Sequence, residues 1–148
     1  MKKENTFFED MRRIGHTWEE NRKARLEKCR EFEKTCGYDS EEYRIWLAEN
    51  PEEPFPFSRG ANKAYQAWEG SSDELILSDI WEDEVTDFIT TIRNAGITEF
   101  IYTEHSTSLM ANIHRFVAEG CTIAGLYKAE YKKFWGTETV IGIRFNVN

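Results

Sequence analysis

Two short polar segments hold the side chains of this chain that could perform chemistry. They follow apolar and β-branched runs at 75–77 and 97–103, which are typical of strands. If both strands are parallel, their carboxyl ends meet at one edge of a sheet, where open α/β sheets bind ligands. A glutamate or histidine there could act as a base and a serine as a nucleophile, although the same residue types cap helices. This ligand or catalytic site is an alternative prediction, and its residues are Ser78, Asp79, Glu104, His105 and Ser106.

Metal or cofactor chemistry has weak support in the sequence. Cys29 and Cys36 would lie about two turns apart on one helix face, too far to share an ion without other ligands. The chain lacks a phosphate-cradling glycine-rich loop, a dinucleotide fingerprint and a CxxC pair. We therefore predict no metal and no cofactor, and we expect the cysteines to be free thiols. The other residues of metal-ligating type are His16, His105, His114 and Cys121.

The charge of the chain is concentrated in its middle. The formal net charge is -8, with -12 over residues 37–104 and +2 on each flank. We call residues 37–104 the acidic belt. Such a belt repels nucleic acids and anionic membranes and attracts basic proteins, although a solvated, solubilising surface has the same composition. Its candidate partner-binding carboxylates are Glu41, Glu42, Glu49, Glu52, Glu53, Asp73, Glu74, Glu82, Asp83, Glu84 and Asp87.

Residues 1–70 are predicted to form a helical N-terminal region. Thr6 and Asp39 are the expected N-caps of its first two helices, because a glutamate follows each of them by three residues. The basic residues of the first helix alternate with glutamates, so direct nucleic-acid binding is not expected. The predicted elements are helices at 6–36, 40–49 and 61–69 and a proline-rich connector at 50–60.

Residues 71–148 are predicted to form an α/β domain with the order β-α-β-α-β-β, which makes the whole chain α+β. The first three strands should run parallel, joined by two helices on one face of a four-stranded mixed sheet. The last two strands should form a hairpin that turns at 135–138, with Ile141 and Phe145 on a buried face. The predicted strands are 75–77, 97–103, 121–134 and 139–147, and the helices are 81–95 and 107–119.

Three segments of this domain carry a resemblance to a known family. They are Ile97 to Met110, Leu75 to Trp81 and Gly142 to Phe145. Together they resemble an uncharacterised family of small α/β domains found in bacteria and in their plasmids, phages and conjugative elements. The resemblance covers the second half of the chain and implies no activity and no site residues. It implies a context, because small acidic proteins of mobile elements are often inhibitors or modulators of host machinery.

The leading functional hypothesis is a non-catalytic, protein-binding module. Its acidic belt would meet a basic surface on a partner, with carboxylates standing in for phosphates against Arg and Lys. An inhibitor or modulator of a nucleic-acid-binding bacterial enzyme, such as an anti-CRISPR protein that mimics DNA, fits this pattern. A structural or regulatory subunit whose partner covers the first helix is a further alternative. No apolar run suits a membrane span or an export signal, so a cytoplasmic protein is expected.

Overall fold

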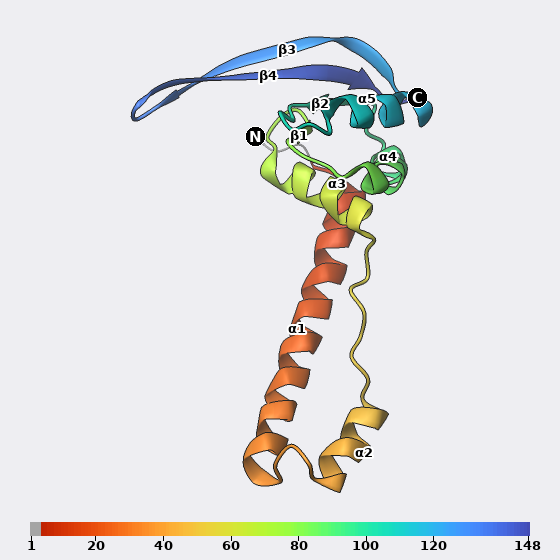
Figure 1. Cartoon of the computed structure of the whole chain (residues 1–148), viewed down its shortest axis with the longest axis vertical. Coiled ribbons are helices and arrows are strands. Elements are labelled where there is room, and N and C mark those ends of the chain that lie inside the picture. The colour runs from red at the N-terminus through yellow and green to blue at the C-terminus, as the bar shows by residue number, and fades with distance from the viewer. Residues whose placement is uncertain (1–3) are drawn as a thin grey trace. The chain divides into compact units, whose positions relative to one another are not determined.

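The computed structural model describes residues 4–148, which form two compact units (Figure 1). One unit holds the residues up to Glu9 together with Phe57–Asn148, and the other is Asp10–Pro56. The unit with the sheet includes helix α3 (Arg59–Gly70), which the sequence-based boundary at residue 70 assigns to the helical region. Helices followed by a mixed sheet with its own helices confirm the predicted α+β class.

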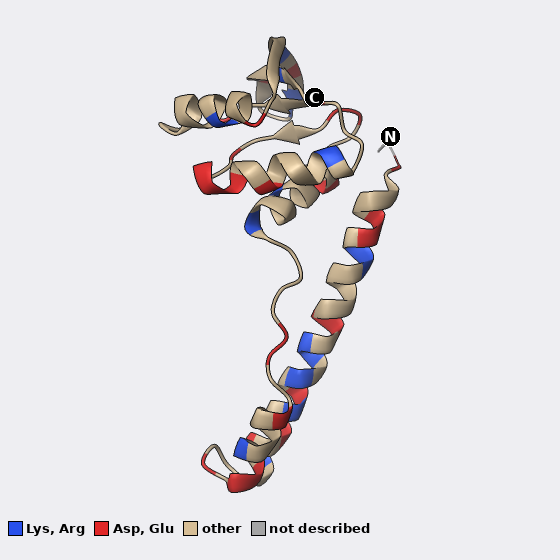
Figure 2. Ribbon diagram, turned by 90° about the vertical axis from the view of Figure 1, so that its right-hand side faces the viewer, with Lys and Arg blue, Asp and Glu red and all other residues tan. Residues whose placement is uncertain are grey.

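The first two predicted helices are confirmed, but their caps differ from the prediction. The side-chain oxygens of Asn5 and Ser40 accept a backbone N–H of the first turn, at 3.2 Å in both helices. The caps predicted at Thr6 and Asp39 are therefore wrong, each by one residue. Basic and acidic residues alternate along the first helix, as expected (Figure 2). The two helices are α1 (Thr6–Thr35) and α2 (Glu41–Glu49).

The connector after α2 is extended but held in place within the Asp10–Pro56 unit. The indole N–H of Trp18 donates to the carbonyl of Glu53 at 3.0 Å, and its ring meets that of Phe55 edge-on at 5.0 Å. The guanidinium of Arg25 donates to the carbonyl of Asn50 at 3.2 Å. Prolines remove regular structure here, so side chains of α1 satisfy the carbonyl groups that a helix or strand would have paired.

The larger unit is built on a four-stranded mixed sheet with the order β1-β2-β4-β3. β1 pairs with β2 in parallel, and β4 lies antiparallel between β2 and β3. The first three strands therefore run in one direction, as predicted, although β3 is not adjacent to β2. The elements after α3 are β1 (Ile76–Leu77), η1 (Glu82–Glu84), α4 (Val85–Asn94), β2 (Glu99–Tyr102), α5 (Leu109–Ala118), β3 (Thr122–Lys133) and β4 (Gly136–Asn146).

Aromatic rings join both crossover helices to the same face of the sheet. The ring of Phe100 in β2 lies 5.5 Å from that of Phe88 in α4 and 5.1 Å from that of Phe116 in α5. Phe116 also lies 5.2 Å from Phe145 in β4, and these four side chains are fully buried. Tyr102, two residues along β2, contacts Phe116 on the same face at 5.1 Å. The prediction that both helices cover one face is confirmed.

Beyond β2 the hairpin continues as a two-stranded ribbon (Figure 1). β2 pairs with β4 only from Ile143 to Asn146, so the remainder of β4 has β3 as its sole partner strand among the described residues. Ile141 lies just past the end of β2 and is 58% exposed, whereas Phe145 is buried. The prediction that both belong to a buried face is wrong for Ile141, because the sheet narrows to two strands there.

The turn of the hairpin is tighter than predicted. Lys133 pairs with Gly136, so the loop between the strands consists of Phe134 and Trp135 alone, rather than residues 135–138. Gly136 has a φ of 142°, a conformation that side chains rarely adopt. Both loop residues are exposed, at 104% for Phe134 and 81% for Trp135.

Helices α3 and α4 approach each other closely at Gly60. A Cβ added to this glycine would lie 2.3 Å from the carbonyl oxygen of Glu84 and 2.9 Å from the backbone nitrogen of Phe88. Backbone atoms cannot rotate away as a side chain does, so a larger residue would push the helices apart. At Gly70, the last residue of the same helix, an added Cβ would meet nothing within 4 Å.

We therefore predict that Gly60→Ala lowers the free energy of unfolding, by about 2 kcal/mol from overpacking. Gly70→Ala is the matched control and should leave stability unchanged or raise it slightly, because alanine is the better helix former. Urea unfolding followed by circular dichroism measures both variants. Equal midpoints for the two would contradict the close helix contact at Gly60.

Candidate functional site

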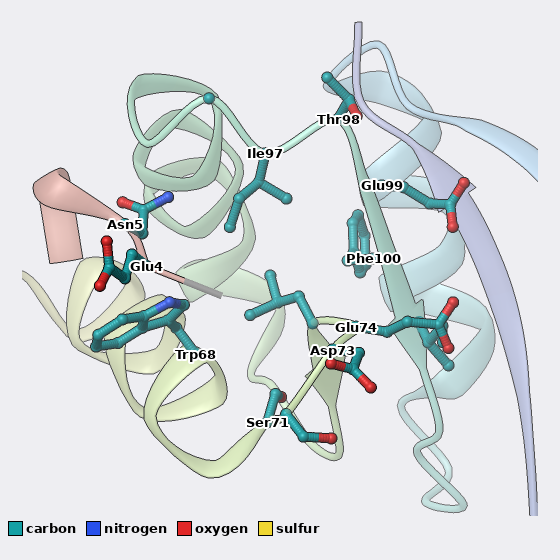
Figure 3. A pocket seen from close by; sticks show the side chains of 14 residues that line it. Glu4, Asn5, Trp68, Ser71, Asp73, Glu74, Ile97, Thr98, Glu99 and Phe100 are labelled. Carbon is teal, nitrogen blue, oxygen red and sulfur yellow. The ribbon is translucent and has the colours of Figure 1, made fainter. Parts of the chain in front are cut away.

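A cavity of about 290 Å³ lies in the larger unit at the amino ends of the parallel strands β1 and β2 (Figure 3). Its walls come from the loop before β1, the start of β2, the side chain of Trp68 in α3, and the residues that open α1. This is the opposite end of the strands from the edge where the sequence suggested a ligand site. The described lining residues are Glu4, Asn5, Trp68, Ser71, Ser72, Asp73, Glu74, Leu75, Gly96, Ile97, Thr98, Glu99, Phe100 and Ile101.

The walls of this cavity are fixed by packing and by hydrogen bonds. The indole of Trp68 stacks on the ring of Phe8 at a centroid distance of 5.2 Å, and both side chains are buried. The hydroxyl of Ser71 accepts the backbone N–H of Ile76 at 3.0 Å, which ties the loop to β1. The amide of Asn5 donates to the carbonyl of Ala95 at 2.9 Å while its oxygen caps α1. The pocket is therefore a preformed feature of the fold.

Carboxylates dominate the charge of the cavity. Glu4, Asp73, Glu74 and Glu99 line it, and none of its described lining residues is Lys or Arg. The guanidinium of Arg144 in β4 pairs with two of these carboxylates, with Glu74 at 2.6 Å and also with Glu99. Hydrogen bonds from Arg144 to these two carboxylates raise its own pKa, so it stays charged. The described residues that line the cavity thus contribute four carboxylates and no cation, and we call it the electronegative pocket.

The chemistry that these groups support is the binding of a cation. Carboxylates attract an ammonium or guanidinium group directly, and an indole attracts it through its π face. Sequence reasoning selected Asp73 and Glu74 but missed Glu4, Trp68 and Glu99. The position of Glu99 beside Glu74 depends on how β2 pairs with its neighbours, which no local pattern reveals. The period of a strand shows no more than that Glu99 and Phe100 point to opposite faces.

The carboxyl edge of the sheet holds a buried network around Glu104, which is 7% exposed. One of its oxygens accepts the backbone N–H of Ile80 at 2.9 Å. The other accepts the hydroxyl of Ser106 at 2.7 Å and the amide of Asn112 at 3.2 Å. The hydroxyl of Tyr102 donates to the same carboxylate. Four donors fill the places that a carboxylate offers, so Glu104 is engaged within the fold.

The protonation states in this network follow from burial and hydrogen bonding. Burial alone raises the pKa of Glu104, but the hydrogen bonds from Ser106, Ile80, Tyr102 and Asn112 together hold it below its ordinary value. Burial raises the pKa of Tyr102 well above its ordinary value, so the phenol keeps the proton that it donates. The amide of Asn112 also donates to the carbonyl of Ile80 at 2.9 Å. The network thus joins α5 to both strand-end loops.

The other residues predicted at this edge lie apart from the network. Asp79 pairs with Lys63 at 3.2 Å, and it lines a separate hollow of about 280 Å³ together with Ser78. His105 is exposed. The structure therefore brings Glu104 and Ser106 together and places Asp79 in a different contact. A ligand or catalytic site at this edge stays a prediction, with its carboxylate already bound by four donors.

The acidic belt is divided within the larger unit between the two ends of the parallel strands. Asp73 and Glu74 precede β1 and line the electronegative pocket, whereas the other candidates in this unit follow β1. Asp83 pairs with Arg59 at 3.2 Å, and Glu84 is only 6% exposed. The group after β1 consists of Glu82, Asp83, Glu84 and Asp87. The other unit holds the remaining candidates, which are Glu41, Glu42, Glu49, Glu52 and Glu53.

Neither a metal centre nor a membrane-spanning helix is found in residues 4–148. No group of three or more His, Cys, Asp or Glu side chains in this range is placed to hold a metal ion. None of the helices in the same range combines the length and the apolar character that crossing a bilayer requires. Cys29 and Cys121 are buried free thiols, and Cys36 is an exposed one.

The buried network gives a prediction about pH. Because the pKa of Glu104 is lower in the folded than in the unfolded chain, its ionised form adds stability that is lost as the pH falls through the folded value. Glu104→Gln should lower the free energy of unfolding at pH 7 by about 2 kcal/mol, through loss of charge-assisted hydrogen bonds. The difference from the parent chain should shrink below the ordinary glutamate pKa.

Urea unfolding at pH 7, 5 and 3 tests this expectation. Glu82→Gln, which changes an exposed glutamate of the same unit, is the control and should match the parent chain throughout. A Glu104→Gln difference that is independent of pH would mean that the ionised carboxylate is not the source of the stability.

Comparison with known proteins gives one match. No curated protein matches the chain, and no solved structure matches it. A family described as a domain of unknown function (DUF7698) matches residues 62–147. The match begins within α3 and continues through β4, so it covers the sheet, its helices and most of the electronegative pocket. It agrees with the resemblance to an uncharacterised family, and the chain belongs to the DUF7698 family.

Proposed function

We propose that this chain is a non-catalytic protein-binding module that engages a basic partner, and that its electronegative pocket receives a lysine or arginine side chain of that partner. The observation that carries the proposal is a preformed cavity whose described lining residues include the carboxylates of Glu4, Glu74 and Glu99 and no Lys or Arg. The cavity of about 290 Å³ suits one long side chain better than a large ligand. Small-molecule sites usually have about 300–1,000 Å³.

The energetics of such a contact depend on how much water the pocket excludes. Exposed ion pairs contribute only about 0–1 kcal/mol each, because water screens them. A cation inside the cavity would instead lie between the carboxylates of Glu4, Glu74 and Glu99, where the local dielectric constant is lower. The carboxylates outside the pocket would act mainly on the rate of association, by steering a basic surface toward it.

The partner class that we propose is a nucleic-acid-processing protein, since these proteins present Lys and Arg side chains to the phosphates of nucleic acids. The chain would compete with nucleic acid for that surface, as an inhibitor or modulator of the anti-CRISPR kind. The net charge of -8 supports a basic partner. The pairing of Asp83 with Arg59 and the burial of Glu84 favour a local contact at the pocket over a long phosphate-like strip.

Removing two pocket carboxylates should weaken the binding of basic peptides. The probe is a fluorescein-labelled peptide of alternating lysine and glycine, with an arginine version and a glutamate version beside it. Glu4→Gln combined with Glu99→Gln should raise the dissociation constant of the basic peptides about tenfold, and added salt should weaken binding by the parent chain. Fluorescence anisotropy at two salt concentrations measures both effects.

The matched control removes two acidic-belt charges, one in η1 with Glu82→Gln and one in the first turn of α4 with Asp87→Asn. It should bind the basic peptides as the parent chain does, and circular dichroism should show all variants folded. If the control loses as much affinity as the pocket variant, the acidic belt binds through its overall charge and the pocket has no special role. If every variant binds the peptides equally and independently of salt, the acidic residues serve only as a solubilising surface.

A further inference from the structure

The outer edge of β3 is an open strand edge. β3 (Thr122–Lys133) pairs only with β4 among the described residues, and no other strand lies on its second side. Its side chains are mostly exposed, with Leu126 at 86% and Tyr131 at 43%. It contains no proline, the residue that most directly blocks pairing at an edge. An edge of this kind presents a row of backbone donors and acceptors to another strand.

The hydrogen bonds of β4 decide which residues of β3 point their backbone groups outward. The N–H of Val147 donates to the carbonyl of Thr98, so odd-numbered residues of β4 face β2 and even-numbered ones face β3. Gly136 and Gly142 therefore exchange hydrogen bonds with their partners Lys133 and Tyr127. Alternation along β3 then leaves the outward-facing N–H and C=O groups on Leu126, Lys128, Glu130 and Lys132.

We propose that this edge is a self-association surface, on which β3 of a second copy of the chain pairs antiparallel about a two-fold axis through Ala129. In this register Lys128 of each copy lies opposite Glu130 of the other, so two ion pairs form across the axis. Opposite charges directly across an antiparallel pair are stabilising. The shared edge joins the two four-stranded sheets into one continuous sheet.

Charge and strand geometry select this register over its neighbours. An axis through Lys128 would set that lysine against its own copy, and an axis through Glu130 would do the same with the glutamate. Both arrangements oppose like charges, which is destabilising. The β-bulge between Ile123 and Gly125 limits the regular part of the strand to residues 125–133, and Ala129 is its midpoint. The proposed axis therefore uses the whole regular segment and pairs its opposite charges.

The other face of the paired strands would gain an aromatic cluster. Tyr127 and Tyr131 of one chain already lie side by side, with their hydroxyls 3.2 Å apart. In the proposed register Tyr127 lies opposite Tyr131 of the second copy, so the four rings gather over the axis. Cross-strand aromatic pairs add to the stability of a sheet. The apolar and the charged contacts thus favour the same alignment.

A disulfide across the axis tests the register directly. Ala129 would face its own copy in a pair without backbone hydrogen bonds, with Cα atoms about 4.5 Å apart, within the range that a disulfide spans. In the full chain with Cys36→Ser, Ala129→Cys should give covalent dimers under mild oxidation. Ala124→Cys is the control and should not, because the two copies of residue 124 lie roughly 30 Å apart in this register. Preferential cross-linking at residue 124, or none at 129, overturns the register.

Charge reversal tests the ion pairs independently in the chain without added cysteines. Lys128→Glu and Glu130→Lys each place like charges across the axis, and each should raise the dimer dissociation constant about tenfold or more. The double variant restores opposite charges in exchanged positions and should recover dimerisation. Sedimentation velocity over a range of concentrations measures all four chains. A parent chain that stays monomeric, or single variants that dimerise as it does, overturns the proposal.

Discussion

The contact of Phe116 with three other phenylalanine rings is the interaction on which the larger unit depends. This one side chain of α5 meets Phe88 of α4, Phe100 of β2 and Phe145 of β4, and all four are fully buried. It therefore sets the distance of both helices from the sheet and fixes β2 beside β4. Both surfaces that we connect with function follow from that pairing. β2 and β4 together place the carboxylates of the pocket, and the length of β4 beyond β2 supports the open edge of β3.

Periodicity in the sequence was sufficient to predict the elements and their layering. The apolar stripes of α4 and α5 place Phe88 and Phe116 on the faces that pack against the sheet, as the structure has them. Local patterns were less informative about where elements end. Asn5 and Ser40 cap the first two helices, because capping depends on backbone geometry at the boundary rather than on a spacing that neighbouring residues also satisfy. Ile141 follows the strand pattern but has no sheet to cover it.

Most of the candidate site could not be predicted from the sequence, and the physical reason is a different one. Glu74 and Arg144 are separated by 70 positions, and Glu99 and Arg144 by 45, yet one guanidinium holds both carboxylates. Such contacts depend on strand order, and β4 lies between β2 and β3 contrary to chain order. The polar ends of β1 and β2 were identified from the sequence, with Glu104 as one residue of the alternative ligand site. The structure gives it four hydrogen-bond donors and a place among the contacts that stabilise the fold.

Arg144 also contacts β3 of the hairpin, so it connects the hairpin with two carboxylates of the pocket. Its guanidinium lies 5.7 Å from the centre of the Tyr127 ring in β3, while it pairs with Glu74 and Glu99. Movement of this ring would change the position of Arg144, the cation that pairs with two carboxylates of the pocket. A cation that enters the pocket would compete with Arg144 for Glu74 and Glu99, and so would change the contact between Arg144 and the ring of Tyr127. If the pocket and the β3 edge bind as we propose, thermodynamic linkage requires each binding event to change the free energy of the other by the same amount.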